Sequence, residues 1–499
     1  MEEPNSTRPF IDSLPNELLS AIFKAGQQTS NPSFRGGLPF PLLVSSVSRH
    51  WRDVALSYHD LWTSIDVSFE APVEYARLWF ERSQPCLVNL TINIRHRRHY
   101  TLYATRHDSI GGDPFRRLLR ESAGRVGRLT VVADSAIDII DVLDVLSHPN
   151  TVFVFLNQLH LYASHYSKSL GDSQQSIDLV APSLRGLRLC QFKLQHLPLL
   201  PNLTYLEISR TIPEPQQFRT FMSGSPSLSH LILSGFPQRD LEPASGAIIH
   251  APCLRFLAFD STSHYGQKCD CILSYLSMPN LEYLEMQGDG YLAPVLTKHF
   301  QMHQPQSRIL STLRTLSLEG FLLGTGDQSV LRTVCPMVTE LHLGRTTDIH
   351  CLVGAFDDSG GRATSTSNQT ASDCAFLWPH LKCLTLHDDT SSWNFVWLAR
   401  AISSRHAAGF LIDTVRICHG MEQYRSVLEG QVKVEIVGSD VAPRFLDSDN
   451  PDDHDDSEES FTDVDRFHDG YDYDDYIDYD DDGDSDDSND DFDMDFFID

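Results

Sequence analysis

The stretches that decide the fold are PNLTYLEIS at residues 201–209 and its near-copy PNLEYLEMQ at residues 279–287. In both, a proline lies two residues before the first position of the pattern apolar-x-x-apolar-x-apolar. The pattern occurs twelve times along the chain at a mean spacing of about 29.5 residues, which is the scale of a structural repeat. The first positions are Leu87, Val126, Leu156, Leu184, Leu203, Leu228, Leu254, Leu281, Leu313, Val338, Leu381 and Ile412.

Eight of the twelve units share the proline. It restricts the preceding residue to extended backbone, so it ends a helix and leads the chain into a strand. Helical spacing of apolar residues fills the segments between the units, most clearly at residues 395–402. Strand followed by helix many times predicts an α/β solenoid, with parallel strands inside a horseshoe and helices outside. We assign residues 85–438 to it, because the alternation over residues 432–436 suits a closing strand.

The N-terminal part of the chain predicts three short amphipathic helices within about 60 residues. Asp12 can cap the first helix and Pro15 fits its first turn, with apolar residues following at positions 18, 19, 22 and 23. A second helical pattern opens at Pro41. The third is marked by apolar residues at positions 51, 54, 55 and 58, which fall on one helical face. So small a unit depends on a partner or on the next domain.

Residues 10–67 resemble the F-box. The matching segments are LPNELLSAIF at residues 14–23, VSRHWRDVA at residues 47–55 and LW at residues 61–62. The resemblance implies that these helices bind the Skp adaptor and, through it, a cullin in an SCF-type ubiquitin ligase. The positions expected to contact the adaptor, or to support that surface, are Leu14, Pro15, Leu18, Ile22, Val47 and Trp51. Residues 68–84 resemble the linker helix that follows the motif in many fungal members.

Two features depart from the F-box pattern. Ser48 stands where the family often has cysteine, and residues 27–37 lengthen the connection between the first two helices. The alternative interpretation is that the apolar residues are simply helical core. The solenoid units mostly lack the Asn or Cys usual after the third apolar residue, so they resemble the looser leucine-rich repeats that often follow an F-box.

The concave side of the solenoid is the predicted target-binding surface. Positions two, four and six after the first apolar residue should face it, because side chains alternate along a strand. In four successive units, position two holds Tyr205, His230, Phe256 and Tyr283, and position four holds Glu207, Ile232, Ala258 and Glu285. We expect an exposed aromatic patch beside an apolar strip flanked by two carboxylates, which suits a target segment with basic and apolar residues. The alternative is that individual aromatics pack under neighbouring loops as core.

The negative charge of the chain is concentrated in residues 447–499. This segment holds 26 of the 68 acidic residues and one of the 39 basic residues, so it accounts for most of the net charge of −29. Such a density of like charge predicts a disordered acidic tail. The tail either binds basic proteins, including histones, or acts only as a solubilising appendage. Residues 357–373 are typical of a mobile surface insertion.

The motifs of common enzyme classes are missing from the sequence. It contains no phosphate-binding glycine loop, no G-x-S-x-G turn and no histidine pair at zincin spacing, and its ten cysteines do not follow zinc-finger spacing. We therefore expect a protein that is not an enzyme, with no catalytic residue, no metal and no cofactor. The polar start of the chain and the lack of a long apolar run indicate a cytoplasmic or nuclear location without a membrane partner.

These observations favour one function and leave an alternative. The favoured function is the substrate-recognition subunit of an SCF-type ubiquitin ligase, in which the F-box binds Skp and the solenoid binds an unknown target protein. The alternative is a non-catalytic scaffold or histone-binding leucine-rich-repeat protein that acts through its acidic tail. Direct contact with nucleic acid is not expected in either case, because the tail repels it.

Overall fold

The computed structural model describes most of the chain between residues 14 and 438. The described ranges are 14–29, 38–68, 73–94, 113–146, 151–165, 179–192, 199–211, 215–234, 248–260, 276–288, 310–320, 331, 333–344, 378–387, 395–418 and 420–438. All of them belong to the larger of two compact units, residues 1–448. The predicted insertion at 357–373 and the acidic tail at 447–499 lie outside the described residues.

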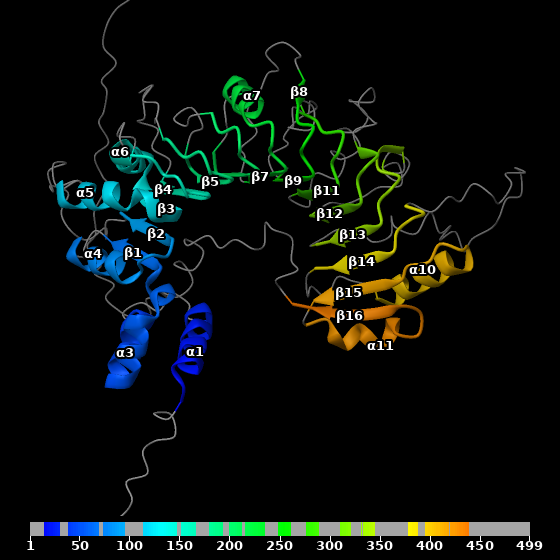
Figure 1. Cartoon of the computed structure of the whole chain (residues 1–499). Coiled ribbons are helices and arrows are strands. Elements are labelled where there is room, and N and C mark those ends of the chain that lie inside the picture. The colour runs from blue at the N-terminus through cyan, green and yellow to red at the C-terminus, as the bar shows by residue number, and fades with distance from the viewer. Residues whose placement is uncertain are drawn as a thin grey trace, which may run out of the picture. The chain divides into compact units, whose positions relative to one another are not determined.

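A single parallel sheet of 14 strands organises the described chain, and its strands are neighbours in almost the same order as in the sequence (Figure 1). The strands are β1 (Ser64–Ser68), β2 (Val88–Asn93), β3 (Val126–Ser135), β4 (Gln158–His165), β5 (Gly186–Cys190), β6 (Tyr205–Ser209), β7 (His230–Ser234), β9 (Phe256–Asp260), β11 (Tyr283–Gln287), β12 (Thr315–Glu319), β13 (Glu340–Leu343), β14 (Cys383–Leu386), β15 (Thr414–Cys418) and β16 (Lys433–Val437). Two short strands, β8 (Ile249–His250) and β10 (Leu276–Ser277), pair separately. The fold is mixed α/β with a long parallel sheet, consistent with a leucine-rich-repeat solenoid.

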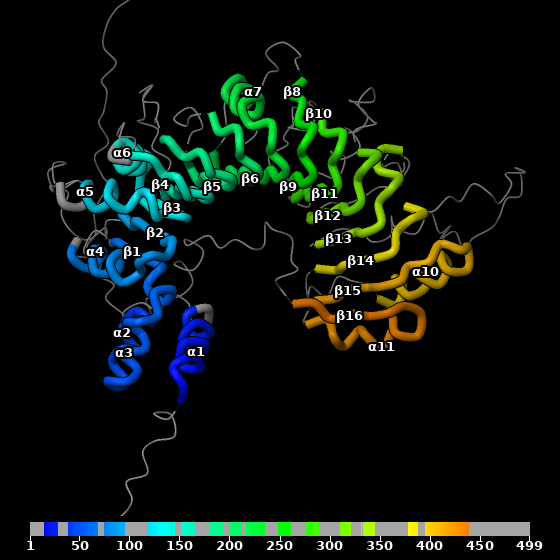
Figure 2. The backbone as a smooth tube through the Cα atoms, viewed as in Figure 1, coloured from blue at the N-terminus to red at the C-terminus, as the bar shows by residue number. Residues whose placement is uncertain are grey.

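In every predicted repeat, a strand begins at the first apolar position or within two residues of it. The strands form there because the apolar positions of each repeat are buried. In the unit of β6, for example, Leu203, Leu206 and Ile208 are all fully buried, while the residues between them are not. The predicted closing strand is β16. The backbone tube in Figure 2 shows the described strands lying side by side along the inner side of the sheet.

Two details of the sheet differ from the predictions. Leu87, the predicted first apolar position of its unit, is about half exposed, and Val88 takes its place in the core. The register between β2 and β3 shifts at Val88 and Asn89. A shift of this kind moves the core-facing position of β2 by one residue, from Leu87 to Val88. In addition, β1 was not predicted. It lies at the end of the segment that resembles the F-box, and it buries Ile65 and Val67.

Helices cover the outer side of the sheet (Figure 1). They are α5 (Asp113–Ser122), α6 (Ala136–Leu146), α7 (Pro215–Gly224), α10 (Phe395–Ala407) and α11 (Arg425–Leu428), with the short 3-10 helices η3 (Ala123–Arg125) and η8 (Glu422–Tyr424). In α10 the residues that predicted a helical face, Phe395, Leu398, Ala399 and Ile402, are all buried. The periodicity therefore marks the core-facing side of this helix.

The N-terminal helices are α1 (Asn16–Thr29), α2 (Phe40–Val47), α3 (Arg49–Ser57) and η2 (His59–Trp62), and α4 (Val73–Arg82) lies in the predicted linker segment. Ser48 separates α2 from α3, because its backbone is extended and its hydroxyl accepts the N–H of Trp51 at 3.2 Å. Trp62 joins this region to the repeats. It is fully buried, its indole donates to the Ala55 carbonyl at 2.8 Å, and its ring meets Trp79 of α4 edge-on.

Candidate protein-interaction surfaces

The first candidate surface is apolar and lies on α1 and α2. In α1, Leu19 and Phe23 are fully buried, whereas Leu18 and Ile22 are 52% and 48% exposed. Residues four apart share a helical face, so α1 presents one apolar pair to its neighbours α2 and α3 and another to solvent. A helix that is apolar on both sides is typical of one with a partner on each.

The other predicted adaptor residues occupy two kinds of position. Val47 at the end of α2 is 56% exposed, and Pro15 just before α1 is exposed as well. Leu14 and Trp51 are half-buried and pack against the core, with the Trp51 ring 5.2 Å from that of Phe23. The structure thus places Pro15, Leu18, Ile22 and Val47 where a partner could contact them. Leu14 and Trp51 instead pack against the core and support this surface.

Leu43 is an exposed apolar residue that the sequence analysis did not select. It lies four residues before Val47 on α2 and is 50% exposed, while Val44 beside it is buried. The same spacing that pairs Leu18 with Ile22 would have identified it. We name the set Pro15, Leu18, Ile22, Leu43 and Val47 the N-terminal apolar surface.

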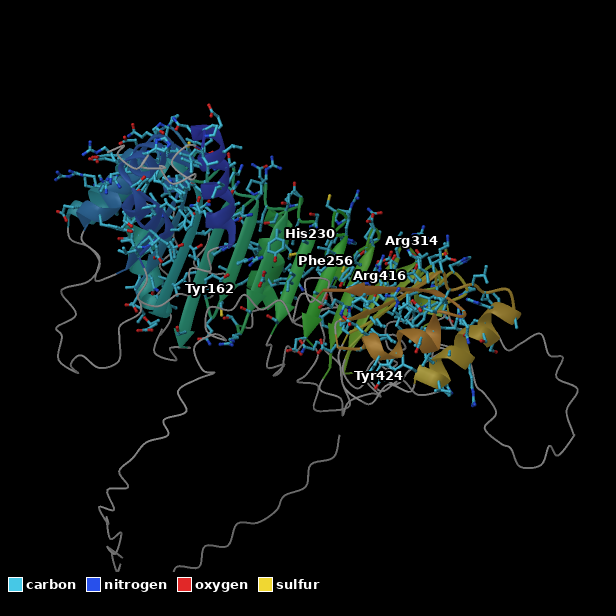
Figure 3. All side chains as sticks on the ribbon, turned by 90° about the horizontal axis from the view of Figure 1, so that it is seen from below. Tyr162, His230, Phe256, Arg314, Arg416 and Tyr424 are labelled. Atoms are coloured by element: carbon cyan, nitrogen blue, oxygen red, sulfur yellow. The ribbon has the colours of Figure 1, made fainter. Side chains whose placement is uncertain are left out.

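The second candidate surface is a row of stacked rings on the concave side of the sheet. Parallel register pairs Tyr205 with His230, His230 with Phe256, and Phe256 with Tyr283 on four neighbouring strands. Their ring centroids are 6.3, 5.5 and 4.3 Å apart, and the last two pairs are stacked, with angles of 23° and 10° between the ring planes. We call these four residues the aromatic ladder. Figure 3 shows His230 and Phe256 on adjacent strands, with Tyr162 nearer the N-terminal end of the sheet and Arg416 nearer the C-terminal end.

The aromatic ladder is half-buried rather than fully exposed, and its tyrosines are held by their own strands. The Tyr205 hydroxyl donates to Glu207 at 2.5 Å, and the Tyr283 hydroxyl donates to Glu285 at 2.8 Å. Each ring therefore lies along its strand over position four, so the ladder offers ring edges to a partner. These geometries follow from the parallel register, which brings equivalent residues of successive units side by side.

The expectation of two exposed flanking carboxylates is wrong for Glu285. Its side chain is 1% exposed, and the hydroxyl of Tyr283 satisfies one of its oxygens. Glu207 remains partly exposed but also forms an ion pair with Arg188 at 3.1 Å. Position four of the two units between them, Ile232 and Ala258, is buried. The predicted apolar strip therefore lies beneath the rings instead of beside them.

Toward the N-terminal end, the ladder continues into a polar cluster on β4 and β5. Arg188 lies 5.5 Å from the Tyr205 ring centroid. Burial has the largest single effect on Arg188 and lowers its pKa, but Glu207, Tyr205 and Tyr162 together outweigh burial, so the pKa is raised. Burial, and then the positive charges of Arg188 and Arg128, lower the pKa of His160 to about 3, so this imidazole is neutral at physiological pH.

Toward the C-terminal end, two histidines that the sequence analysis missed continue the row of rings. His342 on β13 meets Tyr283 edge-on at 6.4 Å, and His387 follows at 5.5 Å from His342. Burial lowers the pKa of each imidazole to about 4. Glu340 Oε2 is 4.0 Å from His342 Nε2, but a neutral ring makes this contact no ion pair. Reading positions four and six in every unit would have found both residues.

The described residues contain no group of three or more His, Cys, Asp or Glu side chains arranged to hold a metal ion. None of the helices described is long and apolar enough to cross a membrane. The two surfaces are built from apolar, aromatic and hydrogen-bonding groups, a composition suited to holding another molecule.

The comparisons with known proteins include a distant likeness of fold. No protein-family model matches the chain. No curated protein matches it either. The crystal structure of the leucine-rich repeat-containing protein LegL7 from Legionella pneumophila is similar over 75% of this chain and 91% of that one, at 12% identity and a TM-score of 0.29.

Proposed function

We propose that this chain is a substrate-recognition subunit of an SCF-type ubiquitin ligase. In this proposal the N-terminal apolar surface binds the Skp adaptor, the adaptor joins a cullin, and the concave face of the solenoid holds the target protein. The chain itself carries out no chemistry. It raises the effective concentration of the target near the recruited ubiquitin-transfer machinery, which is sufficient to accelerate transfer.

One observation carries the proposal. Leu18 and Ile22 on α1, together with Leu43 and Val47 on α2, are all about half exposed, although the same helices also bury a full apolar face. Exposed apolar side chains gathered on adjacent helices are typical of a protein-protein interface. They occur within the segment whose sequence resembles the F-box, and the resemblance implies that Leu18, Ile22 and Val47 contact Skp.

Co-purification with the Skp adaptor tests the proposal. The intact chain should retain the adaptor, while the double substitution Leu18→Asp plus Ile22→Asp should abolish retention, because it places two charges in an apolar interface. Leu14→Ala plus Pro15→Ala should weaken it. Both exchanged residues of the first variant are exposed, so the thermal unfolding of the chain should change little.

Val396→Asp is the matched control, because Val396 is 56% exposed on α10, at the other end of the sheet. It should leave adaptor retention unchanged. Absence of the adaptor from the intact chain would refute the ligase role and favour the scaffold or histone-binding alternative.

A further inference from the structure

The C-terminal end of the sheet leaves part of the solenoid core uncovered. β16 is the terminal strand of the sheet, and within the described residues β15 is its one strand neighbour (Figure 1). Its core-facing residues Val434 and Ile436 are partly exposed. The residues paired with them on β15, Val415 and Ile417, are fully buried. The apolar core therefore reaches the surface along β16.

The two ends of the sheet differ in this respect. At the N-terminal end α4 contacts β1, whose residues Ile65 and Val67 are 1% and 7% exposed. At the C-terminal end α11 contacts β16 but adds another apolar residue, Val427, which is 37% exposed. Repeat arrays need terminal units with a polar outer face to remain soluble. The C-terminal end has instead the composition of a surface that another chain covers.

The outer edge of β16 also presents backbone hydrogen-bonding groups. The Lys433 N–H donates toward β15, to the Asp413 carbonyl at 3.3 Å. Backbone groups of successive residues point to opposite sides of a strand, so those of Val434 and Ile436 point away from β15. An edge of this kind is a template for pairing with a further strand.

We propose that β16 pairs antiparallel with β16 of a second copy of the chain, so that two solenoids share one continuous sheet across a twofold axis. The residues whose backbone groups point outward must lie opposite each other, and this restricts the register. With Val434 opposite Val434 of the second copy, Ile436 lies opposite Val432 and Lys433 lies opposite Glu435. The apolar side chains then cover each other on the core side, and the charged ones meet on the concave side.

Charge favours this register over its two neighbours. A shift in one direction places Lys433 opposite Lys433, and a shift in the other places Glu435 opposite Glu435. Like charges directly opposite each other destabilise a strand pair, whereas opposite charges stabilise it. Lys433 is 68% exposed, and Arg416 contacts Glu435 at 3.2 Å. The carboxylate therefore keeps a partner on its own chain when Lys433 turns to the second copy.

Sedimentation velocity of the full chain at about 0.15 M salt tests the proposal, since distant charges are screened under this condition. We expect a shift from monomer to dimer in the micromolar range, because a contact of one short strand from each copy is small. Lys433→Glu should keep the chain monomeric, because it sets carboxylates opposite each other. Glu435→Lys should do the same with ammonium groups. Val434→Pro should weaken the dimer, because it removes an outward N–H and none that β15 accepts.

A mixture of the two charge variants provides the sharpest measurement. In a mixed pair, both carboxylates of the Lys433→Glu chain lie opposite the two ammonium groups of the Glu435→Lys chain. The mixture should therefore dimerise although neither variant does so alone, and this recovery would also show that both are folded. Lys382→Glu is the matched control, because Lys382 is exposed just before β14 and away from the edge. It should dimerise like the intact chain.

Three results would overturn the proposal. They are an intact chain that stays monomeric up to about 100 µM, a dimer that persists in both charge variants, and a monomeric mixture of variants whose thermal unfolding matches that of the intact chain. A dimer lost equally with Lys382→Glu would do so as well. The adaptor is not involved in any of these measurements, so the outcome is independent of the ligase role.

Discussion

Glu285 and Glu207 occupy equivalent positions, and each accepts a hydrogen bond from the tyrosine two residues before it. Because only Glu285 is buried, removing the two tyrosine hydroxyls should lower the free energy of unfolding by different amounts. Tyr283→Phe removes the hydroxyl that donates to the buried Glu285 at 2.8 Å, so we expect a loss of about 1–3 kcal/mol in the free energy of unfolding. Tyr205→Phe leaves Glu207 with Arg188 and solvent, and should cost less than about 1 kcal/mol. Urea denaturation of both variants measures the difference. Equal losses would contradict the burial of Glu285.

His342 and His387 predict a loss of stability in mild acid. Their folded pKa values of about 4 lie below the ordinary histidine pKa of 6.5, so the unfolded chain binds more protons between these limits. The free energy of unfolding should therefore be highest above pH 6.5 and decrease as the pH falls toward 4. The upper limit is on the order of 3 kcal/mol per histidine.

Chemical denaturation between pH 4 and 7.5 measures this dependence. His342→Gln plus His387→Gln should make the curve less steep, and the lowered pKa of His160 should keep the remaining slope. An unaltered slope in the double variant would assign the acid sensitivity to other groups.

The sequence could predict which residues share the concave surface but not how deeply they are buried. The aromatic ladder follows from one position read down four successive units, because parallel register makes equal positions neighbours. The burial of Glu285 depends on the Tyr283 ring lying along its own strand, and no periodicity encodes a rotamer. His342 and His387 fall outside the four units that were compared.

At the scale of elements, α1 shows the clearest division between packing and binding. Leu19→Ala should lower the free energy of unfolding by about 2–5 kcal/mol, because its fully buried side chain leaves a cavity. Leu18→Ala, at the neighbouring half-exposed position, should change it by less than about 0.5 kcal/mol. Thermal and urea denaturation of the full chain distinguish the two. Similar losses would mean that Leu18 belongs to the core.

Strands were predictable because each repeat must bury its apolar positions, and this requirement repeats along the chain. The exceptions occur at the start of the sheet. The register shift between β2 and β3 accompanies the exchange of Leu87 for Val88 in the core, and β1 is a short strand between two helical segments without the repeat pattern. Local sequence does not fix either feature, since β1 forms by pairing with β2 over residues 64–68 and 89–93.

At the scale of the whole molecule, the pairing of β1 with β2 joins the N-terminal helices to the solenoid. The β1 strand follows η2 directly and is the first strand of the 14-stranded sheet. Arg125 strengthens the junction, since its guanidinium donates to the Phe80 carbonyl at 2.8 Å and to the Cys86 carbonyl at 2.8 Å. A target on the solenoid and an adaptor on α1 and α2 would then be connected through one hydrogen-bonded sheet rather than through a flexible linker.

The acidic tail makes a prediction that concerns the charge of the whole chain. Residues 447–499 carry 26 acidic residues and one basic residue, so removing them leaves a body that is nearly neutral. We expect the intact chain to bind a mixture of histones at low salt, and the affinity to fall steeply as salt approaches 0.5 M, because exposed charges are screened over a Debye length of about 10 Å at 0.1 M.

A chain that ends at residue 446 should lose this salt-dependent binding yet retain the Skp adaptor, because the N-terminal apolar surface is unaffected. Fluorescence anisotropy at several salt concentrations, combined with adaptor co-purification, measures both properties on one preparation. If both chains bind histones equally, the tail only solubilises the protein. If neither retains the adaptor while the intact chain binds histones, the molecule acts as an acidic scaffold, and the exposed residues of α1 and α2 serve a different partner.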